Sequence, residues 1–349
     1  MKTTYIGRVA ALAMVLMLAL SGFAVPVSRA AEKKPLHVFK MATIAPKGTG
    51  WARQYEEIML PEINRATNGE VAFKCFWGGV MGDDEDIVKK MRLGQIDTAA
   101  VSGQGVGAIC PAMTVLTLPF LFNNYGEVDY IREKMFASFD LLTNAQGFKL
   151  IFWIDQDFDQ LYSTKYDFSS PDHFRQAKFL TWYGPVEEKC LEALGASPIP
   201  VNVPEAASSV RQGVVDALIC PAFGIIGFQM QSQIKFMNPI KIRYSPALAV
   251  FSAKSWTRMP EKYRAPMDVD RDRLVNRFLA ATRKDNEKAL TALVRYGVRK
   301  TQVDAKTMDA MRKKTRPAWD ALAGKIYTRQ TLDEILRHLA EYRKKHQGA

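Results

Sequence analysis

The segment Arg92-Leu-Gly-Gln-Ile-Asp97-Thr-Ala, followed at 109–112 by Ile-Cys-Pro-Ala, occurs a second time as Arg211-Gln-Gly-Val-Val-Asp216-Ala-Leu, followed at 219–222 by Ile-Cys-Pro-Ala. Each copy joins the end of a helical pattern to a glycine that stops the helix and a short apolar strand. Such a repeat predicts two lobes built from the same unit. A cleft between two lobes is a preferred place to bind a small molecule, and hinge closure can bury that molecule. Chance similarity between two helix–glycine–strand patterns is the alternative.

Strand-like and helix-like segments alternate around the first copy, which is typical of an α/β fold with mainly parallel sheets. Helical spacing predicts a helix at 51–66, which Pro61 should kink or interrupt. The helix predicted next has acids in its first turn and ends at Gly94. The segments predicted in this part are strands at 36–41, 71–75 and 96–101 and helices at 51–66 and 83–93.

A second lobe is predicted to begin near residue 157. Ser170-Pro171-Asp172 is typical of a capped helix start with proline at the first helical position. The last hundred residues are mostly helical in pattern. The segments predicted in this part are a strand at 160–164, helices at 185–194 and 204–212, each stopped by a glycine, and a long helix at about 265–296.

The N-terminus has the features of a cleavable signal peptide. Lys2 and Arg8 precede an apolar run from Val9 to Leu20, and Ser28-Arg29-Ala30 offers small residues at the two positions that a signal peptidase recognises. We expect residues 1–30 to be removed before Ala31 and the mature protein to be periplasmic. A membrane anchor helix is the alternative, although the apolar run is short for a bilayer. The first cysteine is Cys75, so a lipid-anchored form is not expected.

The composition fits a two-lobed exported protein. The chain carries a formal net charge of +12, and removal of the three basic residues in 1–30 leaves about +12 − 3 = +9. Lys and Arg are scattered, so solvated helix faces explain them better than a nucleic-acid site, and no nucleic-acid partner is expected. The roughly 319 mature residues suffice for two lobes. The four cysteines allow three pairings, and buried free thiols are equally compatible.

Motifs for catalysis are absent from the sequence. The four histidines form no ligand-spaced pair, no nucleophile elbow or phosphate-binding glycine loop occurs, and the cysteines lack a nearby histidine. The acids at 83–86 lack calcium-loop spacing and are better explained as a helix cap. We therefore expect no catalytic residue, metal or cofactor, and an exported hydrolase is the least favoured reading.

The sequence contains a series of motifs in a fixed order. They are Ala42-Thr-Ile-Ala-Pro-Lys-Gly-Thr-Gly-Trp51, Gly78-Gly-Val-Met-Gly82, Gly94-Gln-Ile-Asp97, Leu118-Pro-Phe-Leu-Phe122, Ser169-Ser-Pro-Asp-His-Phe174 and Gln212-Gly-Val-Val-Asp216. In order and spacing they resemble the solute-binding subunits of tripartite ATP-independent periplasmic (TRAP) transporters of the dicarboxylate-binding type. The resemblance covers about residues 36–320.

The resemblance implies a two-lobed α/β periplasmic binding protein with mixed, mainly parallel sheets, crossing strands and a long helix spanning both lobes. Lobe I is expected at 31–157, completed by about 246–285, and lobe II at 158–245, completed by about 286–325. A C-terminal helix and tail occupy 326–349. The resemblance also implies a ligand closed in the cleft and delivered to membrane-embedded TRAP permease subunits.

The residues at the family's ligand positions depart from its pattern. Typical members hold an organic acid with a buried arginine, and the matching position here is Leu180. A second arginine of many members matches Asp159, and a common cleft asparagine matches Cys220. The acid after the glycine turn is retained as Asp84, or as Glu85. Leu180 offers no donor and Asp159 would repel an anion, so a simple carboxylate ligand is not expected.

Aromatic side chains near these positions could instead wall an apolar pocket or surround a cation. The candidates are Trp51, Phe76, Trp77, Phe158, Trp182, Tyr183 and Phe223. About half of them should belong to the core. The binding residues we predict are Trp51, Trp77, Asp84, Phe158, Asp159, Leu180, Trp182, Cys220 and Phe223.

The function predicted from these departures is capture of an apolar, neutral or cationic small molecule for a TRAP-type transporter, without catalysis. Two alternatives stay open. One is a sensory or interaction protein of the same fold that has lost transport. The other is a conventional organic-acid binder that uses residues other than the matching ones.

Overall fold

A computed structural model of the chain describes residues 34–182, 184–269 and 271–346. The predicted signal peptide at 1–30 and Tyr183 lie outside these residues. The strands are β1 His37–Ala42, β2 Val71–Phe76, β3 Thr98–Val101, β4 Phe148–Ser163, β5 Lys178–Thr181, β6 Ser197–Pro200, β7 Ala217–Cys220, β8 Phe236–Ser252 and β9 Arg299–Lys300.

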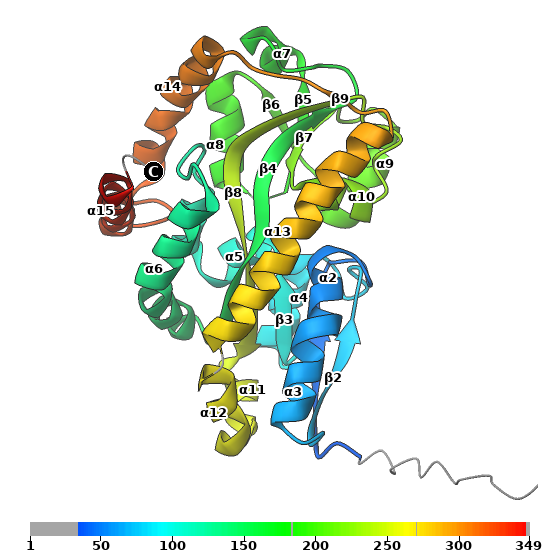
Figure 1. Cartoon of the computed structure of the whole chain (residues 1–349), viewed down its shortest axis with the longest axis vertical. Helices are drawn as coiled ribbons and strands as arrows, with labels where there is room; N and C mark the ends of the chain where they lie inside the picture. The colour runs from blue at the N-terminus through cyan, green and yellow to red at the C-terminus, as the bar shows by residue number, and fades with distance from the viewer. Residues whose placement is uncertain (1–33, 183, 270, 347–349) are drawn as a thin grey trace, which may run out of the picture. The chain divides into compact units, whose positions relative to one another are not determined.

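Helices cover both ends and both faces of these strands (Figure 1). They are α2 Gly50–Gln54, a π turn η1 Tyr55–Met59, α3 Leu60–Ala66, α4 Asp84–Arg92, α5 Gly103–Ile109, a 3-10 turn η2 Pro111–Thr117, α6 Tyr125–Ala145, α7 Pro171–Gln176, α8 Pro185–Leu194, a 3-10 turn η3 Val203–Glu205, α9 Ala206–Arg211, α10 Ala222–Gly227, α11 Ala253–Arg258, α12 Glu261–Val269, α13 Arg271–Arg295, α14 Ala305–Leu322 and α15 Arg329–Lys345.

The described strands form one mixed sheet in the order β2-β1-β3-β8-β4-β7-β5-β6, with β9 beside β8. The first three strands are parallel to one another, and so are β7, β5 and β6. The long strands β4 and β8 run antiparallel through the centre and join the two groups. These are the crossing strands that the resemblance implied, and the sequence had predicted only the end of β4.

The helix–glycine–strand repeat is confirmed, and the aspartates of its two copies make equivalent hydrogen bonds. The Asp97 N–H donates to the Lys40 carbonyl of β1 at 3.0 Å, and Asp97 Oδ2 accepts from the Lys40 N–H at 2.8 Å. Asp216 pairs in the same way with Lys178 of β5, again at 2.8 Å. Each aspartate therefore ties the start of one strand to its parallel neighbour.

The Ile-Cys-Pro-Ala part of the repeat is not equivalent in the two copies, which corrects the sequence comparison. Cys110 follows α5, one helix after its strand. Cys220 is the last residue of β7 itself. The shared tetrapeptide is therefore a chance similarity appended to a true structural repeat.

The predicted interruption of the first helix lies just before Pro61. The helical backbone continues from α2 to α3 through the π turn η1, in which the Leu60 N–H reaches back to the Tyr55 carbonyl. Pro61 has no N–H to donate, so a regular series of helix hydrogen bonds would be interrupted at this residue. The wider π turn lies directly before it.

The long helix α13 packs along β4, and α6 packs on the same strand. In Figure 1, α13 runs along the crossing strands rather than beside one group of strands. The predicted lobe boundaries at 157/158, 245/246 and 285/286 fall inside β4, β8 and α13. The boundaries themselves stay a prediction, and the elements that contain them are shared by both groups of strands.

Candidate functional site

The two groups of parallel strands point their C-terminal ends toward each other. Val101 ends β3 at the level of Leu248, which pairs with Trp153 of β4. Cys220 ends β7 and pairs with Gln160 of β4. Residues 154–159 of β4 cross the interval, about 20 Å at roughly 3.3 Å per residue. In α/β sheets, ligands bind outside the carboxyl ends of strands, so this interval is the candidate site.

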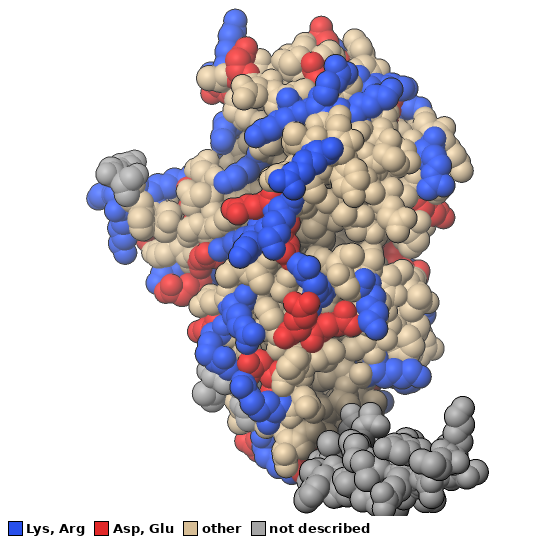
Figure 2. All heavy atoms as spheres, turned by 45° about the vertical axis from the view of Figure 1, so that its right-hand side comes forward, with Lys and Arg blue, Asp and Glu red and all other residues tan. Residues whose placement is uncertain are grey.

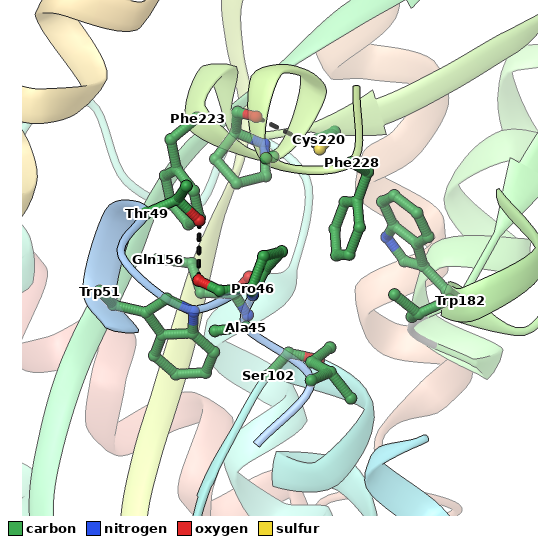
Figure 3. Close-up of a pocket in the computed structure, with 15 residues that line it drawn as sticks. Ala45, Pro46, Thr49, Trp51, Ser102, Gln156, Trp182, Cys220, Phe223 and Phe228 are labelled. Carbon is green, nitrogen blue, oxygen red and sulfur yellow. Dashed lines mark hydrogen bonds between the residues drawn. The ribbon is translucent and has the colours of Figure 1, made fainter. Parts of the chain in front are cut away.

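A hollow of about 520 Å³, its open side included, lies there (Figure 3). Little of that space is enclosed, because the cavity proper is about 30 Å³, below the ~300–1,000 Å³ usual for small-molecule sites. Strand-end loops of β1, β3, β5 and β7 supply most of its walls. The lining residues are Ile44, Ala45, Pro46, Thr49, Trp51, Ser102, Gln156, Trp182, Val203, Cys220, Pro221, Phe223, Gly224, Gly227 and Phe228.

Aromatic rings dominate the walls of this hollow. Trp51 and Phe223 lie on one side of Pro46, and Trp182 and Phe228 lie on the other. The Trp182 and Phe228 ring centroids are 6.4 Å apart. None of the described lining residues is Lys, Arg, His, Asp or Glu. The hollow is therefore suited to an apolar group and offers no cation to a carboxylate.

The polar groups of the wall are largely engaged with the protein. The Thr49 hydroxyl donates to the Pro46 carbonyl at 2.9 Å. The Ser102 hydroxyl donates to Asp84 Oδ2 at 2.5 Å. Gln156 Nε2 lies 3.4 Å from the Pro246 carbonyl across β8. A ligand in the hollow thus meets few hydrogen-bonding groups on this side.

Gly50 allows the Phe223 ring, part of the wall of the hollow, to approach the backbone closely. It has φ +47°, and a Cβ placed on it would lie 2.7 Å from the Phe223 ring. A real Cβ does not approach a ring carbon so closely, so Phe223 can occupy this position only beside glycine.

Asp84 lies behind the wall rather than in it. Its carboxylate is fully buried and accepts hydrogen bonds from the Ser102 N–H, the Ser102 hydroxyl and the Gly105 N–H. Burial raises the pKa of Asp84 to about 6, although these hydrogen bonds favour the charged form. The carboxylate holds the start of α5 and so places Ser102 at the hollow.

Asp159 is paired and fully buried, which corrects the view of it as an anion facing the cleft. Its Oδ2 accepts from Arg243 Nε at 2.5 Å and from the Ser245 hydroxyl at 2.6 Å. Arg243 Nη1 lies 2.8 Å from Glu187 Oε1. Burial raises the pKa of Asp159, and Arg243 opposes this rise.

Glu187 links this buried group to the wall. Its Oε2 accepts the Trp182 backbone N–H at 2.9 Å. Arg243, buried between Asp159 and Glu187, is therefore part of the support of Trp182 and lies outside the lining.

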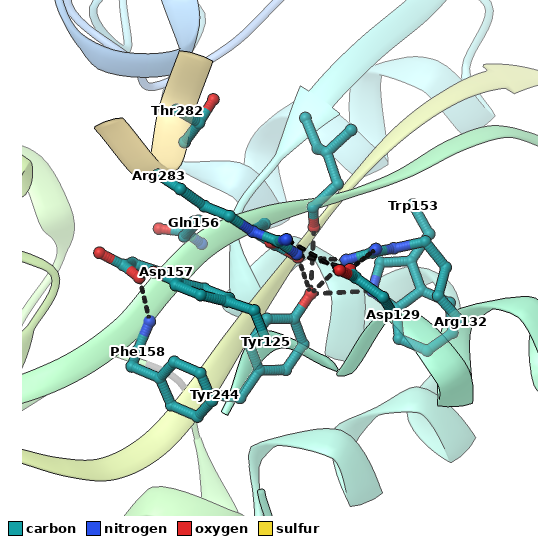
Figure 4. Close-up of polar contacts among 12 residues, drawn as sticks. Tyr125, Asp129, Arg132, Trp153, Gln156, Asp157, Phe158, Tyr244, Thr282 and Arg283 are labelled. Atoms are coloured by element: carbon teal, nitrogen blue, oxygen red, sulfur yellow. Dashed lines mark hydrogen bonds and ion pairs between the residues drawn. The ribbon is translucent and has the colours of Figure 1, made fainter. Parts of the chain in front are cut away.

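Two other arginines near the strand crossing, the buried Arg132 and the half-buried Arg283, are also paired (Figure 4). Arg283 of α13 contacts Asp155 Oδ2 through Nε at 2.8 Å and Asp129 Oδ2 through Nη1 at 2.8 Å. Arg132 of α6 contacts Asp155 and Asp129. These ion pairs join α6 and α13 to β4, and none of their arginines lines the hollow.

Of the nine predicted binding residues, the structure brings together Trp51, Trp182, Cys220 and Phe223 around the hollow. The other five do not line it. Phe158 is buried with its ring 5.2 Å from that of Tyr125, and Leu180 is fully buried in the core. Trp77 packs edge-on against Tyr55. Ligand contact by any of the nine stays a prediction.

Sequence reasoning missed Gln156 and Phe228 among the lining residues. It also missed Thr49 and Ser102, although both follow predicted strands, and the carboxyl-end rule could have found them. Phe228 lies just after α10 and had no motif to mark it. The four cysteines are free thiols, so none of the three pairings occurs.

The sequence matches the model of the family described as bacterial extracellular solute-binding protein, family 7, over residues 41–326. The chain belongs to this family. The resemblance to TRAP solute-binding subunits is thereby confirmed. Within the described residues, no helix combines the length and apolarity needed to cross a bilayer.

Relatives of this solute-binding protein include the C4-dicarboxylate-binding periplasmic protein DctP of Rhodobacter capsulatus, 25% identical over 82% of this chain and 85% of that one. A solute-binding protein of Chromohalobacter salexigens is 22% identical over 76% of this chain and 78% of its own length. The uncharacterized protein YiiZ of Salmonella typhimurium is 26% identical over 44% of this chain, which spans only 48% of that relative.

Solved structures of this class have the same fold. The sugar acid binding protein DctPAm of Advenella mimigardefordensis, in complex with galactonate, superposes with a TM-score of 0.83 at 19% identity, over 88% of this chain and 99% of that one. A TRAP periplasmic solute-binding protein of Sulfurospirillum deleyianum with bound succinate gives 0.80 at 18% identity, over 86% and 99%. The predicted two-lobed α/β fold is therefore confirmed.

Proposed function

We propose that the protein is a periplasmic binding subunit that captures a neutral, apolar or cationic small molecule for a TRAP-type permease and performs no catalysis. The observation that carries this proposal is the aromatic hollow, whose described lining residues include no ionisable one other than Cys220. Cys220 is buried and burial raises the pKa of its thiol well above the ordinary value, so it brings no charge.

The pairing of Arg243 with protein carboxylates also supports a ligand without a carboxylate. An arginine that binds a ligand carboxylate needs free donors aimed at the ligand. Arg243 is 4% exposed and directs Nε to Asp159 and Nη1 to Glu187. An incoming carboxylate would have to compete with two buried carboxylates already in place, which is costly in a site poor in water.

The relatives supply the competing proposal of an organic acid. The names of two similar structures give galactonate and succinate as the bound molecules. For this chain, an acid would have to be held by backbone N–H groups or by polar side chains such as Gln156, because the lining offers no cationic side chain among the described residues.

Native mass spectrometry of gently purified protein distinguishes these proposals. We expect one bound molecule without a carboxylate, released by Phe223→Ala and retained by Trp77→Leu, a matched aromatic change outside the hollow. Stoichiometric recovery of a mono- or dicarboxylate from the wild-type protein would reject the proposed ligand class. Export and transport are tested separately, by detection of the mature chain in the periplasm and by ligand uptake that depends on a permease.

A further inference from the structure

A second, larger hollow adjoins the aromatic one. It holds about 1740 Å³, its open side included. Trp182 lines both hollows, and Ser102 and Val203 of the first are near neighbours in sequence of Gln104 and Asn202 of the second. The two hollows therefore meet along the start of α5, the end of β5 and the turn before η3.

The side chains of the second hollow have the opposite character. Glu85, Glu188 and Glu205 line it, with Lys325 as the one basic residue among the described lining residues. The formal balance is therefore 3 − 1 = 2 negative charges in excess. Among the described residues none of the three carboxylates forms a salt bridge, although Glu188 interacts electrostatically with Lys189 of the same helix.

Two polar atoms at this hollow lack hydrogen-bond partners among the described residues. Thr181 is 2% exposed, and its Oγ1 has no partner. Gln104 Oε1 is likewise buried without one. Leaving a buried polar atom unsatisfied costs roughly 1–3 kcal/mol, so such atoms are expected where a ligand supplies the missing partner. Gln104 Oε1 can only accept, so the missing partner there is a hydrogen-bond donor.

We propose that the two hollows form one binding site for an elongated amphipathic cation. Its apolar part lies among Trp51, Trp182 and Phe223. Its positively charged, hydrogen-bond-donating end extends into the second hollow, near Thr181, Gln104 and Glu188. This inference rests on the proposed function, because it gives a chemical class to the ligand of the same protein.

Three probes that differ only at one end test the inference by titration calorimetry: 4-phenylbutylamine, 4-phenylbutan-1-ol and 4-phenylbutanoate. We expect the amine to bind about tenfold more tightly than the alcohol, equivalent to about 1.4 kcal/mol, and the carboxylate to bind most weakly. Raising the salt concentration should weaken the amine and leave the alcohol unchanged.

Variants assign the effect to the second hollow. The double variant Glu188→Gln with Glu205→Gln should lower the affinity for the amine about tenfold and leave the alcohol unchanged. Glu192→Gln is the matched control, because Glu192 is exposed on the same helix α8 and outside the hollow. Thr181→Val should weaken the binding of the amine and of the alcohol without lowering the melting temperature, since the hydroxyl makes no hydrogen bond to a described residue.

The outcomes separate this inference from the proposed function. Equal binding of amine and alcohol, or an amine affinity untouched by the double variant, would overturn the second subsite and leave the neutral aromatic site standing. Tightest binding of the carboxylate would overturn both. A wild-type protein that binds none of the three probes would overturn the joined site.

Discussion

Arg243 of β8 and Asp159 of β4 face each other as cross-strand partners, with Nε 2.5 Å from Oδ2, in a position where neither is exposed by more than 4%. The resemblance matches Asp159 with an arginine of many family members. In this chain the guanidinium instead lies on the neighbouring strand, between two carboxylates. The guanidinium thus lies outside the lining of the hollow, with Nε at Asp159 and Nη1 at Glu187.

Replacing Arg243 by methionine should destabilise the protein strongly. The change leaves Asp159 and Glu187 buried without their cation, and removal of one partner from a buried ion pair costs about 3–5 kcal/mol. Urea unfolding followed by circular dichroism measures the loss. Lys241→Met on the same strand is the control, because this lysine is exposed, and it should cost less than about 1 kcal/mol. Equal losses in the two variants would contradict a structural role for the Arg243 pairs.

Trp182→Leu and Phe223→Leu should each weaken ligand binding about tenfold or more, because each removes an aromatic wall of the hollow. Trp77→Leu should leave the affinity within about twofold, since Trp77 packs on Tyr55 outside the hollow. Titration with the co-purified ligand gives the three constants. A loss in Trp77→Leu as large as in the others would restore Trp77 to the binding residues.

A pair of glycine variants tests the fit of the Phe223 wall. Gly50→Ala and Gly48→Ala both place a side chain at positive φ, but only the Gly50 Cβ would meet the Phe223 ring. Both should lose stability from backbone strain, and Gly50→Ala alone should lose ligand affinity, about tenfold for a displacement worth about 1–2 kcal/mol. Thermal melts and titration separate the two effects. Loss of affinity in both variants would show that the loop conformation, rather than the ring, is decisive.

Asp84 should make stability fall as the pH rises from about 4 to 6. Its pKa is raised by burial from 3.8 to about 6, so the folded state holds the proton more tightly than the unfolded state. The stabilisation is complete below pH 4 and is lost as the pH rises through 6, by at most about 3 kcal/mol.

Urea unfolding across pH 3.5–7.5 measures this slope. Asp84→Asn should reduce it, because the buried Asp157 and Asp159 also have raised pKa values and still contribute. Asp83→Asn, the neighbouring helix cap, should leave the slope unchanged. A slope that persists unchanged in Asp84→Asn would assign the linkage to another group.

The native thiols should react very slowly with a thiol reagent at pH 8. Cys110, Cys190 and Cys220 are buried, and burial raises the pKa of the half-buried Cys75 to about 11. At pH 8 about one Cys75 in a thousand is then a thiolate, the reactive form. Four thiols should react rapidly once the protein is denatured. Rapid reaction of one native thiol would contradict the buried environment.

The fold could be predicted where the sequence carries local signals. Gly94 and Gly213 stop helices in the left-handed region, and the strand after each glycine is mostly apolar and fully buried. The family motifs then supplied the two-lobed arrangement. Trp51 and Phe223 were identified as wall residues because they lie next to such motifs at strand ends.

The rest depended on contacts between distant segments. Asp155, Asp157 and Asp159 alternate along β4, a pattern that favours a solvated face of a strand. They are buried instead, with Arg283 from α13 and Arg243 from β8 supplying the charges for Asp155 and Asp159. Asp159 and Arg243 are 84 residues apart, and β4 pairs with β8 through three register shifts. No local pattern specifies that register, so the pairing of Asp159 could not be foreseen.

The position of β8 in the sheet has a consequence for how the chain reaches its native state. β8 lies between β3 and β4, yet it is made of residues 236–252, long after both of its neighbours. One edge of β3 stays open until those residues have left the ribosome, and α13, which covers β4, follows later still. Pairings across such long intervals form slowly. The polypeptide is therefore expected to remain largely unfolded throughout synthesis, which is the state that a secretory pore can thread.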